Sequence, residues 1–264
     1  MTEEIQEKQK KINILFTDEL LKGEKITFDT KYYEKLNNNF FEIIQSTENE
    51  VTYKFIPKIF GEDFVVNDCI RYSIRPSKED FIIEHKEINK LSDAKKCIIF
   101  ILESPHIDEY DLVENIKGVN ISSDNFKPNF PAAGKSGDNI ENILKFLNDI
   151  DKFKENIDVI LINRIQFQTS LGSFLKDNGK KVFAPIRNRI FDILWGKENI
   201  EKNFWERLTE FIEKYQEKII INVSTKDSDK ESEFHKKLEA KMAEYSLSVK
   251  HYNHPSNWGI KKNE

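Results

Sequence analysis

Cysteine is scarce in this chain of 264 residues, and its scarcity excludes several kinds of site. The two cysteines, Cys69 and Cys97, lie far apart and form no C-x-x-C pair. Two such cysteines are too few for a disulfide framework. They also do not supply the ligands of a cysteine-bound zinc ion or an iron–sulfur cluster. We therefore expect neither a metal site nor a cofactor.

Long apolar runs are also missing. No stretch approaches the roughly 20 apolar residues of a membrane span, and the N-terminal segment MTEEIQEKQKK has no apolar signal region. We expect a cytoplasmic protein with no membrane partner. The net charge of −5 argues weakly against nucleic acid, although a local basic face can still steer phosphates.

The first third of the chain shows no internal repeat and no linker rich in proline, glycine or serine. Short β-type runs such as VTYKFIPKIF (51–60) and DFVVNDCIRYSI (63–74) alternate with polar turns, and a helix is possible over 31–44. We expect residues 1–93 to form an accessory region that is β-rich or α+β.

Apolar runs alternate with helical patterns from Ala94 onward, which is typical of βαβ units. The strands are expected at 97–102, 157–163, 218–224 and 247–252, and the helices near 138–150, 185–195, 201–216 and 229–245. Right-handed βαβ connections place such strands side by side and parallel. The prediction for 94–264 is an α/β domain whose four-stranded, mostly parallel sheet is flanked by helices.

Polar residues follow each predicted strand. Because parallel strands bring their carboxyl ends to one edge of a sheet, where ligands bind in open α/β folds, we expect these residues to share one rim. They are Glu103 to His106, Asn163, Ser224 to Lys226 and Asn253 to Ser256.

Four motifs on these strand ends resemble those of the uracil-DNA glycosylase superfamily. The segment LESPHIDE after the first strand resembles the family's G-E-x-P-G-x-x-E, and PAAGKSG (131–137) resembles its P-F-x-G-x-x-G. VILIN ends in an asparagine as the family's strand does, and HPSNW (254–258) contains the closing H-P-S. The resemblance covers about residues 94–264 and implies a fold like that of uracil-DNA glycosylases, with DNA as the partner.

The resemblance implies catalytic roles for three residues. Glycosidic cleavage passes through an oxocarbenium-like state, so a carboxylate such as Glu103 or Glu109 can stabilise positive charge and position water. His254 matches the family's histidine, which stabilises negative charge on the departing base. Either carboxylate could instead cap a turn, and His254 could be an ordinary turn residue.

Base binding is implied for a second group. Asn163 matches the asparagine that contacts the base, and an amide offers both a donor and an acceptor. Gln166 lies just beyond it as a weaker candidate. His106 stands beside the base position, where it could gate the pocket or donate a proton.

Backbone and strand-gap contacts are implied for a third group. Ser256 is expected on a DNA phosphate, and Trp258 could wedge into the gap that a flipped base leaves, or pack in the core instead. Lys135 and Ser136 begin a helix whose backbone amides could hold a phosphate.

The sequence departs from the family at several positions. Leu102 replaces the leading glycine, Ser104 stands where the best-known branch has a catalytic aspartate, and Ala132 replaces the base-stacking phenylalanine. Phe130, two positions earlier, could take over the stacking, the site could be decayed, or the pocket could be enlarged. An enlarged pocket would admit a bulky modified cytosine, as in enzymes of phage defence.

Three functions remain open at this point. The first is a monofunctional DNA glycosylase that flips a pyrimidine out and releases it, leaving an abasic site. The second is a catalytically silent binder of nucleotides or nucleic acid, and the third hydrolyses a free nucleoside or nucleotide. The excised base, the strandedness of the DNA and the oligomeric state do not follow from the residues.

Overall fold

The structure is a computed structural model. It describes residues 9–30, 40–77, 81–85, 92–112, 121–122, 124–146, 155–169, 179–224, 229–255 and 258. The chain divides into two compact units. One comprises residues 1–65, 110–128 and 167–194, and the other comprises residues 66–109, 129–166 and 195–264.

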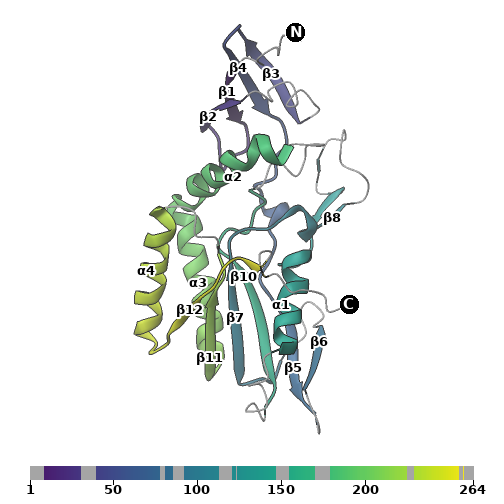
Figure 1. Ribbon diagram of the computed structural model, residues 1–264, viewed down its shortest axis with the longest axis vertical. Coiled ribbons are helices and arrows are strands. Elements are labelled where there is room, and N and C mark those ends of the chain that lie inside the picture. The colour runs from purple at the N-terminus through teal and green to yellow at the C-terminus, as the bar shows by residue number, and fades with distance from the viewer. Residues whose placement is uncertain are drawn as a thin grey trace, which may run out of the picture. The chain divides into compact units, whose positions relative to one another are not determined.

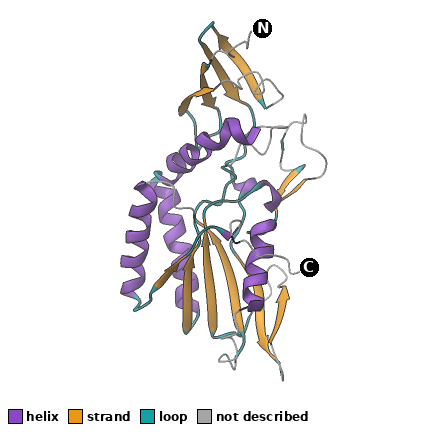
Figure 2. Ribbon diagram, in the orientation of Figure 1, coloured by secondary structure: helices purple, strands orange, loops and turns teal. Residues whose placement is uncertain are grey.

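The second unit contains a six-stranded sheet in the order β12-β11-β7-β10-β5-β6 (Figures 1 and 2). Its central strand β7 pairs in parallel with β10 on one side and β11 on the other, and β12 continues the parallel set. The prediction of four parallel strands is therefore confirmed. Their bounds are Lys96–Leu102 for β7, Ile157–Asn163 for β10, Glu217–Asn222 for β11 and Val249–His251 for β12.

Two further strands make this sheet larger than the four strands expected. Strand β5 (Cys69–Pro76) pairs antiparallel with β10, and β6 (Phe81–His85) forms a hairpin with β5. Both precede residue 94 and belong to the same unit as the parallel strands, because the chain first passes from one unit to the other between residues 65 and 66. The sequence predicted the β character of this stretch. It did not predict pairing with β10, because pairing between segments so distant in sequence leaves no local pattern.

Both faces of β7 and β10 are buried, as their continuous apolar runs predict, whereas β11 and β12 are only partly buried. Alternate residues of β7, including Phe100, face a core cluster that also contains Ile140 and Leu144 of helix α1 (Lys135–Phe146). Ile99 and Ile101, which point the other way, are fully buried as well. Figure 1 draws α1 in front of the sheet and α3 (Glu198–Lys214) behind it.

The helices lie where the sequence predicts them, but several begin or end at other residues. Helix α2 spans Gly179–Trp195 and α4 spans Asp229–Glu244. Helix α1 begins at Lys135, three residues before the predicted start at residue 138, and the predicted residues 147–150 lie outside the described residues. None of the helices in the described residues is long and apolar enough to cross a membrane.

The first unit contains a four-stranded sheet in the order β2-β1-β4-β3, which accords with a β-rich N-terminal region. Its strands are β1 (Lys10–Phe16), β2 (Lys25–Thr30), β3 (Phe41–Ser46) and β4 (Glu50–Phe55). The helix considered over 31–44 is wrong for its last residues, since they start β3; residues 31–39 lie outside the described residues. The unit also holds the short 3₁₀ helix η2 (Glu62–Phe64) and the hairpin of β8 (Tyr110–Leu112) and β9 (Phe126–Pro128).

Candidate functional site

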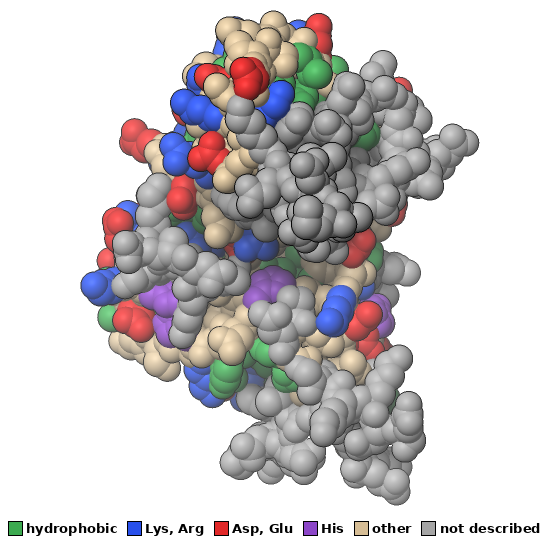
Figure 3. All heavy atoms as spheres, turned by 45° about the horizontal axis from the view of Figure 1, so that its top comes forward, with side chains coloured by type: hydrophobic (Ala, Val, Ile, Leu, Met, Phe, Trp, Pro, Cys, Tyr) green, Lys and Arg blue, Asp and Glu red, His purple; other side chains and the backbone are tan. Residues whose placement is uncertain are grey.

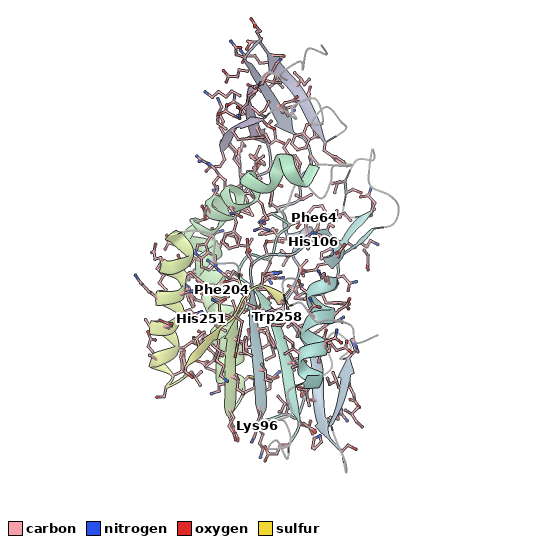
Figure 4. The ribbon with its side chains drawn as sticks, in the orientation of Figure 1. Phe64, Lys96, His106, Phe204, His251 and Trp258 are labelled. Carbon is pink, nitrogen blue, oxygen red and sulfur yellow. The ribbon has the colours of Figure 1, made fainter. Side chains whose placement is uncertain are left out.

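The carboxyl ends of β7 and β10 lie level with one another, since Asn163 pairs with Leu102. The chain that leaves β7 turns into the 3₁₀ helix η3 (Ile107–Glu109), whose last residue returns to this level. Figure 4 shows His106 of that turn near the carboxyl ends of the strands and Lys96, the first residue of β7, at the far end of the sheet. The ends of β7 and β10 therefore share one rim, as expected, while Thr225, Lys226 and Ser256 of the expected set lie outside the described residues.

Glu109 is the acid that faces this rim from inside the protein. Glu109 is only 5% exposed. Its Oε1 atom accepts the backbone N–H of His106 at 3.2 Å, and Oε2 accepts the Asn163 amide at 3.4 Å. The backbone N–H of Ala132 also donates to the carboxyl group. Three motifs that are distant in sequence thus converge on one carboxyl group.

Burial raises the pKa of Glu109 from 4.5 to about 8. The hydrogen bonds from His106, Ala132 and Asn163 favour the carboxylate and lower the pKa, but they offset desolvation only in part. The neighbouring Asp108 raises the pKa further. A carboxyl group that titrates near neutral pH is suited to proton transfer, because it can hold or release a proton under working conditions.

Asn163, at the end of β10, has a fully buried side chain with one unused polar atom. Its Nδ2 donates to Glu109, whereas its Oδ1 has no hydrogen-bond partner among the described residues. A buried polar atom without a partner costs roughly 1–3 kcal/mol, so it calls for an explanation. A ligand that supplies a donor would satisfy it.

The backbone of Asn163 is held by two residues that sequence reasoning missed. Asp68 Oδ1 accepts the Asn163 N–H at 3.1 Å, and Arg207 Nη2 donates to the Asn163 carbonyl at 3.0 Å. Asp68 and Arg207 also form an ion pair with each other. Burial raises the pKa of Asp68 to about 6, although the Arg207 guanidinium lowers it. A lone aspartate before a β-type run was the only sequence signal, and nothing local marked Arg207.

The PAAGKSG segment (131–137) packs tightly against η3, and its own backbone turns back closely onto Ala132. A Cβ atom on Gly137 would lie 1.9 Å from the Ala132 carbonyl oxygen, and one on Gly134 would lie 2.6 Å from Oδ2 of Asp108. Only glycine permits the approach at Gly137, because the atom that its Cβ would meet is a backbone oxygen, whereas the Asp108 side chain could move away from a Cβ on Gly134. Ala132 itself has a positive φ of 54°. Gly137 therefore permits the tight turn that contains Ala132, whose backbone N–H donates to Glu109.

Ala132 and Phe130 differ from what a stacking platform requires. The Ala132 side chain is 1% exposed and belongs to the core cluster of the sheet and α1, so it does not line an open pocket in this structure. Phe130 is half-buried, and the Arg71 guanidinium covers one face of its ring at 3.6 Å from the ring centre. Stacking of a base on Phe130 would have to use the other face.

The H-P-S turn after β12 docks on helix α1. Asn139 donates its side-chain amide to the Pro255 carbonyl at 2.7 Å, and the Trp258 N–H donates to the same oxygen at 3.1 Å. His254 is half-buried at this turn, while Ser256 lies outside the described residues. The Trp258 side chain packs against the core cluster, as a core tryptophan would, and its wedge role stays a prediction.

The other candidates are more peripheral. The His106 side chain is 46% exposed, and its Nδ1 lies 3.3 Å from Asp108 Oδ2. Glu103 is half-buried, and its backbone carbonyl accepts the N–H of Ile165. Gln166 and Ser136 are half-buried, and Lys135 is exposed. Within the described residues no group of three His, Cys, Asp or Glu side chains could hold a metal ion.

Comparison of the chain with protein-family models, with curated proteins and with solved structures finds no match.

Proposed function

We propose that this protein is a monofunctional DNA glycosylase, which flips a pyrimidine out of the strand and hydrolyses its N-glycosidic bond. The observation that carries the proposal is the buried pair of Glu109 and Asn163 at the carboxyl ends of two parallel strands. An acid with a raised pKa beside an amide with an unused acceptor combines a proton-transfer group with a base-reading group. The four motifs described above add the resemblance to uracil-DNA glycosylases.

Glu109 acts in this proposal as a carboxylate. The transition state of glycosidic cleavage carries positive charge on the sugar, and a desolvated carboxylate stabilises it while positioning the attacking water. The raised pKa of Glu109 means that the carboxylate is formed as the pH approaches 8. Glu103, which is half-buried nearer the start of the same turn, is the second candidate for this charge.

The unused Oδ1 of Asn163 favours a base that carries a hydrogen-bond donor. Cytosine presents an exocyclic amino group at its pairing edge and uracil presents its N3–H there, so either base can donate to Oδ1. The hypothesis of a modified cytosine therefore rests on the replacement of the family's stacking phenylalanine by Ala132. The small side chain of Ala132 favoured a bulky substituent on that base, but because this side chain is packed in the core, the size of the substituent is left to experiment.

Contacts with DNA phosphates would come from individual side chains. Figure 3 shows Lys and Arg side chains interspersed with Asp and Glu on the described part of the surface that it draws. Lys135 is exposed at the start of α1, beside backbone N–H groups of the first helical turn. Such a surface predicts a modest salt dependence, because few counterions would be released.

The test is base release from oligonucleotides that contain cytosine, hydroxymethylcytosine, glucosylated hydroxymethylcytosine or uracil, single-stranded and paired. We expect alkali-labile abasic sites and, by mass spectrometry, a free cytosine-type base. Release of uracil alone would contradict the hypothesis of a modified cytosine. Binding of DNA without release of any base would identify a silent binder, and cleavage of free nucleotides alone would identify a nucleotide hydrolase.

A further inference from the structure

At the end of strand β10, the backbone N–H and C=O of Asn163 need hydrogen-bond partners other than a residue of β5. In a β-strand the N–H and C=O of one residue point toward the same neighbouring strand. On the other side of β10, the next residue, Arg164, already bonds the Leu102 carbonyl of β7. The backbone of Asn163 therefore faces the side of β5. Strand β5 begins at Cys69, which pairs with Leu161, so within the described residues no residue of β5 lies opposite Asn163.

Two side chains take the place of the missing strand. Asp68, the residue just before β5, accepts the Asn163 N–H, and Arg207 of helix α3 donates to the Asn163 carbonyl. The ion pair between Asp68 and Arg207 closes the ring. Both side chains are well shielded, with 4% exposure for Asp68 and 16% for Arg207. Hydrogen bonds that involve charged groups are stronger than neutral ones and hold their partners in a narrower range of geometry.

We propose that Asp68 and Arg207 are positioning residues, which hold the backbone of Asn163 so that its side-chain amide meets Glu109 and the incoming base. This role rests on the proposed function. Its physical basis is that the backbone of a residue sets the direction of its Cα–Cβ bond. The hydrogen bond between Asn163 Nδ2 and Glu109 is already long at 3.4 Å, so a small rotation of the backbone would break it.

The sharpest variant is Arg207→Lys, which keeps the charge but loses the planar fork that reaches Asp68 and Asn163 together. We expect kcat for base release to fall about 10–100-fold with KM changed less than about threefold, since misplacement of a reacting group by about 1 Å costs on this order. Arg75→Lys is the matched control, because Arg75 forms an exposed pair with Glu84 at the opposite end of β5. Should Arg207→Lys fail to fold, Asp68→Asn tests the same ring while keeping an acceptor for the N–H.

A second measurement does not depend on catalysis. The Asn163 amide lowers the pKa of Glu109, which Asp108 raises. If the ring of Asp68, Arg207 and Asn163 positions that amide, Arg207→Lys raises the midpoint of the Glu109 titration. The titration is measured in infrared spectra from the carbonyl band of the protonated carboxyl group, and the spectrum of Glu109→Gln identifies the contribution of Glu109. Asn163→Ala should raise the same midpoint, and the double variant should raise it no further than Asn163→Ala alone.

The double variant also separates positioning from mere stability. A residue that acts only through Asn163 gives no additional loss of kcat once Asn163 is alanine. Additive losses in the double variant, or an unchanged Glu109 midpoint in Arg207→Lys, would overturn the inference. If the wild-type protein releases no base from any DNA, the proposed function fails, while the infrared titration still decides whether the ring positions Asn163.

Discussion

Replacement of Glu109 by glutamine tests the central feature of the site through protein stability. The folded protein holds the pKa of this carboxyl at about 8, against 4.5 for the ordinary side chain. Folding therefore favours the protonated form. The wild-type stability is complete below pH 4.5 and is lost progressively as the pH rises through the interval from 4.5 to 8. Glutamine cannot ionise and escapes this loss.

The magnitude follows from the two pKa values. Their difference, at about 1.4 kcal/mol per pKa unit, amounts to roughly 5 kcal/mol, of which about 3–4 kcal/mol falls between pH 5 and pH 8. We expect the free energy of unfolding of Glu109→Gln to gain this amount relative to wild type over that range. Asp68 also titrates with a raised pKa, but it is present in both proteins and cancels from the comparison.

The assay is urea unfolding followed by tryptophan fluorescence. All three tryptophans, Trp195, Trp205 and Trp258, lie in the unit that contains Glu109, so the signal reports that unit. The dependence on pH is the informative quantity, because the glutamine amide also changes the hydrogen bond to Asn163 at every pH. Glu62→Gln makes the same chemical change on an exposed side chain and serves as control. A constant difference between wild type and Glu109→Gln from pH 5 to pH 8 would refute the raised pKa.

Three further predictions concern the reaction and the fold. Asn163→Ala and His254→Ala should each lower base release by about a hundredfold or more, the effect of losing one hydrogen bond made in the transition state, with a smaller change in DNA binding by gel shift; wild-type rates in both would show that the site is elsewhere. The value of kcat/KM should rise with pH to a plateau above about 8, as the Glu109 carboxylate forms; a fall above that pH would assign Glu109 the role of an acid. Gly137→Ala should destabilise the protein by several kcal/mol in thermal unfolding, because its Cβ would overlap the Ala132 carbonyl; an unchanged melting temperature would contradict the tight turn.

Local sequence patterns were sufficient for the four parallel strands and for most of the site. A strand buried on both faces must be apolar throughout, and a helix that covers a sheet must be apolar on one side, so both leave a pattern in adjacent residues. The polar residues that end such strands are then brought to one rim by topology alone. Asn163 could be named as a candidate on that basis, whereas Glu109 was named because LESPHIDE resembles a motif of the uracil-DNA glycosylase superfamily.

Tertiary structure decided what local patterns could not. Burial singles out Glu109 over Glu103, because the pKa of a carboxyl depends on the desolvation and donors that the folded chain supplies. The hairpin of β5 and β6 joins the main sheet by pairing with a strand more than eighty residues later in the chain. Asp68 and Arg207, 139 residues apart, meet at the end of β10, where no described residue of β5 lies opposite the backbone of Asn163. Contacts of this kind join residues that are distant in sequence, so no local periodicity records them.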